Sequence, residues 1–184
     1  MKKQPEITEK TRQAFVDVFC ELYCQTPIEK ISIREIANRS GYNRSTFYQY
    51  FSDIYELLNY VENDVIRYME GFLQSTKGVK LSSQDFVQNV ILMFEHKGKY
   101  LHALLSDYGS IRFLDRLKAE LPINQLERHV SEDHPLLPYV VEFHISTVLS
   151  LFRLWVRRDK DLSHEELFSL IDALLNTGVS SLAP

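Results

Sequence analysis

Apolar residues recur every three or four positions along most of the chain, which is the spacing of one face of an α-helix. The first such run is predicted at residues 8–25, and a helix of about 20 residues is predicted to begin at Ser52–Asp53 and to end between residues 74 and 78. A half-buried strand would instead alternate strictly between apolar and polar residues, and no stretch does so convincingly. The pattern therefore predicts an all-α fold of about nine helices.

The second half of the chain holds the remaining predicted helices. Their ranges are 83–96, 99–105, 111–121, 139–157 and a last helix capped by Ser163, with a possible short helix at 124–130. The last two helices are apolar around much of their surface, so a pair from each of two chains can form a four-helix bundle. The alternative is that both helices pack on their own core. The predicted dimer interface consists of Val140, Phe143, Thr147, Leu151, Leu167, Leu170, Ile171 and Leu174.

Residues 32–51 carry the most specific local pattern. Ser32 and Glu35 have the spacing of a capping box at the start of a helix. Gly41 follows where that helix should end and where φ must become positive. Asn43 can then cap a short helix at 44–50. A helix, a glycine turn and a second short helix form a helix-turn-helix, whose second helix lies in the DNA major groove.

The short second helix carries one arginine and four aromatic residues. Arg44 is the candidate for reading bases, because arginine pairs with guanine through two hydrogen bonds, although it could also be a solvated surface residue. Phe47, Tyr48, Tyr50 and Phe51 cannot all point inward on one helix. We expect Phe47 and Phe51 to point inward, which gives at least one tyrosine a DNA-facing role.

The net charge of −4 is unusual for a DNA-binding protein. Residues 1–55 contain eight Lys or Arg and seven Asp or Glu, whereas the remainder contains 13 and 18. The acidity therefore lies outside the helix-turn-helix. A charge of +1 in the first 55 residues still means that few phosphates can be neutralised by lysine or arginine.

The sequence lacks the patterns of the other function classes. It has no nucleophile elbow, phosphate loop or metal-ligand spacing, so we expect no enzyme activity, cofactor or metal. Cys20 and Cys24 fall on one helix face and are interpreted as small buried side chains. The chain has no signal-peptide pattern and no run of 18 apolar residues, so we expect a cytoplasmic protein that does not enter a membrane.

The segment ISIREIANRSGYNRSTFYQYFSDIYELL, residues 31–58, resembles the DNA-binding domain of the TetR family of transcriptional regulators. The resemblance implies a homodimer with a helix-turn-helix DNA-binding domain in residues 1–51 and a helical ligand-binding and dimerisation domain in residues 52–184. It further implies a repressor that binds a palindromic operator in double-stranded DNA and leaves it when a small-molecule effector binds. The DNA contacts implied by position are Ser32, Arg34, Asn43, Arg44, Ser45, Thr46, Tyr48 and Tyr50.

The sequence departs from the family pattern just after residue 51. Members of the family commonly carry lysines there, whereas this chain has Ser52 and Ile54. The remaining donors are hydroxyls, backbone N–H groups and the helix dipole. We therefore expect DNA affinity to depend only weakly on salt.

The effector pocket is the least determined part of the prediction. Candidate lining residues are His102, Tyr108, Arg112, His144 and Trp155, which are polar or amphipathic residues near apolar helices. Each such residue taken alone is more often an interface or core residue. Two further functions stay open, namely a TetR-like activator and a helical interaction protein controlled by a protein partner. The sequence names neither the effector nor the operator.

Overall fold

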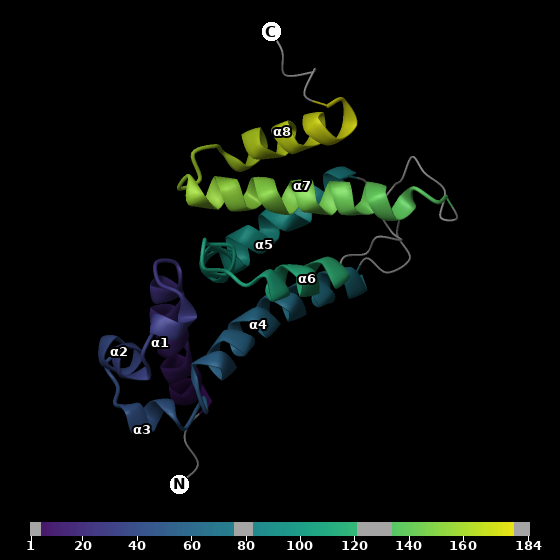
Figure 1. The fold of residues 1–184 in the computed structure, drawn as a ribbon. Coiled ribbons are helices and arrows are strands. Elements are labelled where there is room, and N and C mark those ends of the chain that lie inside the picture. The colour runs from purple at the N-terminus through teal and green to yellow at the C-terminus, as the bar shows by residue number, and fades with distance from the viewer. Residues whose placement is uncertain (1–4, 76–82, 121–133, 179–184) are drawn as a thin grey trace. The chain divides into compact units, whose positions relative to one another are not determined.

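The computed structural model describes residues 5–75, 83–120 and 134–178, and within these ranges the chain is helical (Figure 1). No strand occurs among these residues, so the predicted all-α fold is confirmed. The helices are α1 (Pro5–Tyr23), the 3₁₀ turn η1 (Ile28–Lys30), α2 (Ile33–Arg39), α3 (Arg44–Phe47), α4 (Ile54–Ser75), α5 (Ser83–Leu104), α6 (Ile111–Ala119), α7 (Leu137–Arg157) and α8 (His164–Asn176). The described ranges thus hold eight α-helices rather than about nine. The possible helix at 124–130 lies outside the described residues.

Two predicted helix boundaries were wrong, and one predicted break is found as a kink. Helix α1 begins by Pro5 rather than at Thr8, and proline suits a first turn because it has no N–H to leave unpaired. Helix α3 ends at Phe47 instead of Tyr50, since the N–H of Tyr50 turns back to the carbonyl of Phe47 at 2.9 Å in a tighter, three-residue pattern. Helix α5 is one element as far as Leu104, but Lys97 inside it has non-helical angles (φ −120°, ψ 16°), so the interruption predicted at Gly98 is present as a kink one residue earlier.

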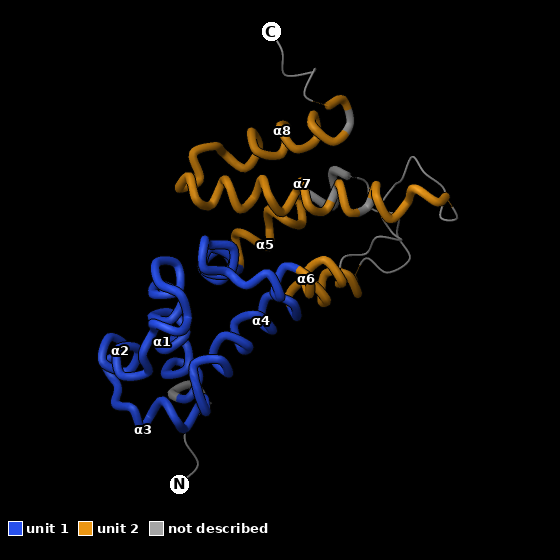
Figure 2. Tube along the Cα trace, viewed as in Figure 1, with its two compact units in different colours: residues 1–67, 97–114 blue, residues 68–96, 115–184 orange. Residues whose placement is uncertain are grey.

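The chain packs as two compact units (Figure 2). Unit 1 contains residues 1–67 and 97–114, and unit 2 contains residues 68–96 and 115–184. Helices α4 and α5 are each divided between the two units. The segments that surround the helix-turn-helix therefore include the last turns of α5 as well as α1 and the first half of α4.

The core of unit 1 is centred on an aromatic side chain of α1. Phe15 is fully buried, and its ring centroid lies 5.3 Å from those of Tyr42 and Phe47 and 5.9 Å from that of Tyr50. Aromatic pairs at such separations contribute about 0.5–1.5 kcal/mol beyond the area that they bury. Helix α1 is thereby fixed against the turn that precedes α3 and against α3 itself.

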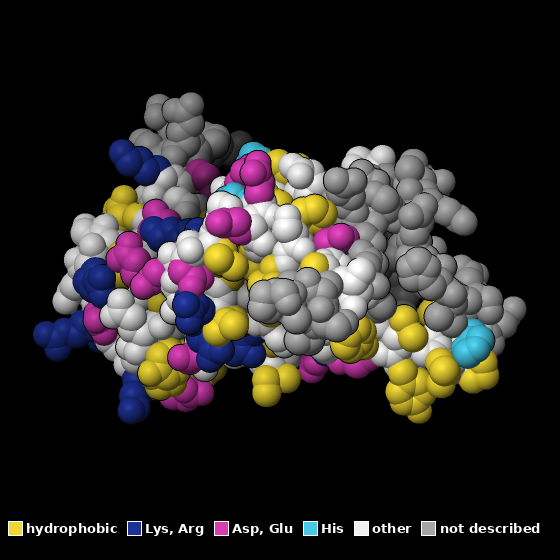
Figure 3. All heavy atoms as spheres, turned by 90° about the horizontal axis from the view of Figure 1, so that it is seen from above, with side chains coloured by type: hydrophobic (Ala, Val, Ile, Leu, Met, Phe, Trp, Pro, Cys, Tyr) yellow, Lys and Arg dark blue, Asp and Glu magenta, His cyan; other side chains and the backbone are white. Residues whose placement is uncertain are grey.

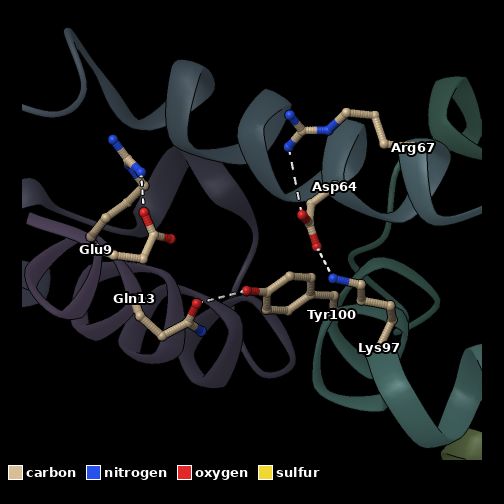
Figure 4. A network of polar contacts seen from close by, with 7 residues as sticks. Glu9, Gln13, Asp64, Arg67, Lys97 and Tyr100 are labelled. Carbon is tan, nitrogen blue, oxygen red and sulfur yellow. Dashed lines mark hydrogen bonds and ion pairs between the residues drawn. The ribbon is translucent and has the colours of Figure 1, made fainter. Parts of the chain in front are cut away.

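Polar contacts join α1, α4 and α5 on another side of unit 1 (Figure 4). Asp64 of α4 accepts a hydrogen bond from Lys97 at 2.5 Å and pairs with Arg67 at 3.5 Å. Tyr100 of α5 donates to Gln13 of α1 at 3.0 Å. Lys97 is also the residue at which α5 bends, so the bend presents its ammonium group to α4.

Unit 2 is built around α7. The ring of Phe94 stacks on that of Phe152 with centroids 4.8 Å apart, and the indole N–H of Trp155 donates to the carbonyl of Leu162 at 2.8 Å. Helix α8 begins with a complete capping box in which Ser163 and Glu166 each accept from the other's backbone N–H. The predicted start of the last helix is thus confirmed.

Helix α7 carries two apolar faces. One face is buried in unit 2 and includes Ile145, Val148 and Phe152, whereas Phe143 and Leu154 on the other are exposed. By length and composition alone α7 could also cross a membrane, and 31% of its apolar stretch is buried. Core helices of soluble proteins meet the same criterion, so hydropathy alone does not indicate a membrane span. The exposed apolar face of α7 is the more informative feature.

Candidate nucleic-acid interface

Helix α2 begins at a side-chain cap and packs through one face. The hydroxyl of Ser32 accepts a hydrogen bond from the backbone N–H of Glu35 at 3.1 Å. Ile36 and Ala37 are fully buried, whereas Ser32 and Arg34 are exposed. The first turn of α2 therefore leaves a hydroxyl and a guanidinium group accessible to a phosphate backbone.

The turn between α2 and α3 has the geometry predicted from its glycine. Gly41 has φ +79°, its N–H donates to Asn38 at 3.2 Å, and the N–H of Tyr42 donates to Ala37 at 2.9 Å. These two bonds form a Schellman motif, which satisfies carbonyls at the end of α2. The Tyr42 ring then packs on Phe15, so the direction in which the chain enters α3 is fixed by the core.

A single amide oxygen organises the first turn of α3. The Oδ1 atom of Asn43 accepts from the Thr46 N–H at 2.8 Å, from the Ser45 hydroxyl at 2.6 Å and from the Thr46 hydroxyl at 2.9 Å. The predicted cap is confirmed. It also holds the hydroxyls of Ser45 and Thr46 side by side at the start of α3, next to Arg44.

The two faces of α3 divide as expected. Phe47 and Phe51 are buried at 0% and 3% exposure, which confirms them as the inward pair, and Tyr48 on the other side is 50% exposed. Arg44 is exposed and makes no ion pair with any residue in the described ranges. Its guanidinium group is therefore available at the outer end of the short helix.

Tyr50 is held differently from Tyr48. Its ring packs against Phe15, and the guanidinium of Arg12 lies 5.9 Å from the centroid of the same ring. Tyr50 is half-buried in consequence. Of the two tyrosines, Tyr48 thus presents the larger accessible surface.

The start of α4 is negatively charged. Asp53 accepts from the N–H of Glu56 at 2.8 Å, and the carboxylate of Glu56 accepts from the N–H of Ser52. These hydrogen bonds to Ser52 lower the pKa of Glu56 below its ordinary value. The backbone N–H of Ser52 is therefore occupied by the chain's own carboxylate. Ile54, at the other position where a lysine is common in the family, is buried and does not face solvent.

The order of these elements agrees with comparisons to known proteins. Residues 16–61 match the bacterial regulatory proteins of the tetR family. The N-terminal domain is of the TetR type. No curated protein matches the sequence of the chain.

Solved structures share the fold across nearly the whole chain. A fatty acid degradation regulator, FadR, from Bacillus halodurans is 14% identical with a TM-score of 0.64, and the match covers 97% of this chain and 98% of that one. A tetR-family transcriptional regulator from Streptomyces coelicolor is 20% identical with a TM-score of 0.56, covering 94% and 85%. The dihydroxyacetone kinase operon activator DhaS is 17% identical with a TM-score of 0.58, covering 93% and 97%. The chain thus shares its fold with these regulators, and a helical region follows the TetR-type N-terminal domain.

The predicted pocket residues are divided among different surroundings. Tyr108 and Arg112 line one cleft of unit 1 with a volume of about 350 Å³. His102 has its Nδ1 3.0 Å from the Sγ of the half-buried Cys24, and Trp155 is buried in unit 2. The side chain of His144 lies outside the described residues. The structure thus brings together two of the five.

The predicted interface residues also fall into two groups. Phe143 is 56% exposed, and Val140, Thr147, Leu151, Leu170 and Leu174 are partly exposed. Leu167 and Ile171 are already buried at 3% and 0% within one chain, where they hold α8 in unit 2. These two side chains have almost no surface left to bury against a second copy. Exposed apolar side chains are visible at several places on the face in Figure 3, including its lower right edge.

Replacing Gly41 with alanine tests whether the turn sets the geometry of the helix-turn-helix. An added Cβ meets no atom within 4 Å, so the cost comes only from φ +79°, and we expect a loss of about 1 kcal/mol in the free energy of unfolding. Urea denaturation followed by circular dichroism measures it. Gly71→Ala is the matched control: this helical glycine of α4 also has open space, and we expect a gain of about 0.5–1 kcal/mol. If both substitutions changed the free energy of unfolding equally and in the same direction, the requirement for a positive φ at Gly41 would be contradicted.

Proposed function

We propose that this chain is a homodimeric, sequence-specific DNA-binding repressor that leaves its operator when a small-molecule effector binds. The observation that carries the proposal is the capped α2–Gly41–α3 unit, with Arg44 exposed and free of ion pairs among the described residues. Arg44 reads a base, most simply guanine, through two hydrogen bonds. Residues 1–51 form the DNA-binding part and residues 52–184 the regulatory and dimerisation part.

The other contacts are assigned to the DNA backbone. Ser32 and Arg34 are exposed at the first turn of α2, and Tyr48 is exposed beside Arg44. The hydroxyls of Ser45 and Thr46 must rotate away from Asn43 if they are to donate to phosphate or a base edge. Tyr50, which packs on the core, can offer only its hydroxyl edge. Such contacts fix the register of the protein on DNA, whereas Arg44 supplies sequence information.

A two-fold dimer follows from the second apolar face of α7. Val140, Phe143, Thr147, Leu151 and Leu154 recur at intervals of three or four residues and retain exposed surface. Two copies packed through this face, with Leu170 and Leu174 of α8 at its border, form a helical bundle. The two recognition helices then meet two half-sites of a palindrome.

A second reading keeps the DNA-binding unit and changes the outcome. One structural neighbour is named as an operon activator, so the TetR-type fold does not by itself favour repression. The helical region could also be controlled by a protein partner. A reporter gene placed behind the operator separates the two readings, because deletion of this protein raises expression if it represses and lowers expression if it activates.

Removing the guanidinium of Arg44 should weaken specific binding. We expect Arg44→Ala to weaken binding to the DNA upstream of its own gene by about 1–3 kcal/mol, which is roughly five- to 150-fold. Gel shifts at low salt measure the loss, and Arg158→Ala, an exposed arginine of unit 2, should leave binding unchanged. The DNA-binding proposal fails if the wild-type protein shifts no genomic fragment.

The acidic start of α4 should limit how strongly salt weakens binding. We expect log affinity against log salt to have a slope equivalent to fewer than six phosphates. Ser52→Lys restores a cation beside this edge and should steepen the slope by about 0.9 per bound protomer. Titrations at four or more salt concentrations provide the slopes. A wild-type slope equivalent to six or more phosphates would contradict the expectation.

A charge on the exposed face of α7 should separate the protomers. We expect Phe143→Asp to raise the dimer dissociation constant at least about 30-fold, as is typical when a central interface residue is lost. Sedimentation velocity measures the monomer fraction, and circular dichroism checks that helicity is retained. Ile111→Asp, which replaces an equally apolar exposed side chain of unit 1, should stay dimeric. A monomeric wild type, or a variant as dimeric as wild type, rejects this interface.

A further inference from the structure

The cleft of unit 1 is lined in part by η1, the element that precedes α2 of the helix-turn-helix. Its walls come from the end of α1 (Tyr23), from η1 (Glu29), from α4 (Tyr55 and Glu62), from the segment before α6 (Tyr108) and from the first turn of α6 (Arg112). All of these residues belong to unit 1. A volume of about 350 Å³ is at the lower end of the range of small-molecule sites. The cleft can thus take a ligand of modest size without a contribution from unit 2.

The lining carries more negative than positive charge. Glu29 and Glu62 supply two carboxylates, against the single guanidinium of Arg112. Glu62 is only 3% exposed, whereas Glu29 and Arg112 are exposed. Burial raises the pKa of the Tyr23 phenol to about 12, and the nearby carboxylates of Glu62 and Glu29 contribute to the same shift. The negative potential is therefore concentrated around the Tyr23 side of the cleft.

Aromatic side chains provide the remaining recognition chemistry. Tyr55 and Tyr108 are 52% and 42% exposed and line the same cleft, and Tyr23 lies at its buried side. A ring face attracts an ammonium group by about 0.5–1 kcal/mol at exposed sites and by more when the group is desolvated. Tyrosine rings beside two carboxylates suit a cation that also carries hydrocarbon.

We propose that this cleft binds a small organic cation, an amine or a quaternary ammonium compound. The cationic group lies between Glu62 and Glu29, and the hydrocarbon part lies against Tyr55 and Tyr108. Arg112 stands at the exposed side, where its own charge opposes the ligand. An anionic ligand would instead have to bring its charge to a lining with a net charge of −1.

Occupation of the cleft bears on α2 through η1. Glu29 is within η1, and only Ile31 separates η1 from Ser32, the cap of α2. A cation that attracts both Glu29 and Glu62 draws η1 towards α4. This coupling to DNA rests on the proposed function, whereas binding of the cation itself does not. By linkage, a cation that weakens DNA binding must itself be bound less tightly by the DNA complex.

Calorimetric titration of the full-length protein tests the site directly. The probes are 1,4-diaminobutane and tetraethylammonium, with 1,4-butanediol as the neutral counterpart and butanoate as the anion. We expect millimolar or tighter binding of at least one cation, and no binding of the diol or of butanoate. The proposal is overturned if neither cation binds at millimolar concentration, or if the diol or butanoate binds as well as the cations.

Three substitutions in the cleft and one control substitution locate the binding and establish its sign. Glu29→Gln should weaken cation binding about threefold and Glu62→Gln about tenfold or more, because the second carboxylate is buried. Glu165→Gln makes the same change of charge on exposed surface of α8 and should have no effect. Arg112→Gln should tighten cation binding. Tighter binding also shows that the variant is folded, so weaker binding by Arg112→Gln, or unchanged binding by Glu29→Gln, overturns the proposal.

Operator binding in the presence of the cation keeps the two proposals apart. If calorimetry detects the cation but no DNA is bound, the function proposed above fails and the site stands. If DNA is bound but no cation binds, the site fails and the DNA-binding proposal stands. If both bind, a cation-dependent loss of the gel shift that is smaller in Glu29→Gln supports the coupling, and equal loss in both proteins removes Glu29 from it.

Discussion

The packing of Phe15 against three aromatic rings is the interaction on which the helix-turn-helix depends. Helices α2 and α3 contain seven and four residues, and isolated helices of this length are not stable in water. Their stability must therefore come from capping and from burial. Phe15 supplies the burial, because its ring contacts Tyr42 in the turn, Phe47 in α3 and Tyr50 just after α3. The outward face of α3 can then be given to polar residues without loss of the fold.

Local chemistry explains why this part of the chain could be predicted so closely. The capping roles of Ser32, Asn43 and Ser163 depend on residues within three positions, and the positive φ of Gly41 depends on the residue itself. Helical spacing likewise predicted that Phe47 points inward and that a neighbouring tyrosine stays exposed, as Tyr48 does. Interactions of such short range can be read from the sequence because no distant partner decides them.

Contacts between distant residues explain where prediction failed. The cleft combines Glu29 with Glu62 and Arg112, and no spacing in the sequence relates three positions so far apart. In α5, the break predicted at Gly98 is present as a kink at Lys97, but the sequence did not predict the hydrogen bond from Lys97 to Asp64 on α4. A glycine permits a break, but the contacts of the neighbouring residues decide whether one forms. Trp155 stays a predicted pocket residue, and the sequence did not predict that its indole N–H donates to the carbonyl of Leu162.

Helix α4 links the two electrostatic features of unit 1. At its start, Asp53 and Glu56 bind the helix's own N–H groups and place negative charge beside the DNA-reading surface. Two turns from Glu56, Glu62 faces the cleft, and Asp64 pairs with Lys97 near the boundary of the unit. A protein that relied on strong attraction to phosphate could not carry so many carboxylates on this helix. On the proposed function, weak attraction to phosphate makes DNA binding more dependent on the geometry of α2 and α3, which is the geometry that a ligand between η1 and α4 is proposed to alter.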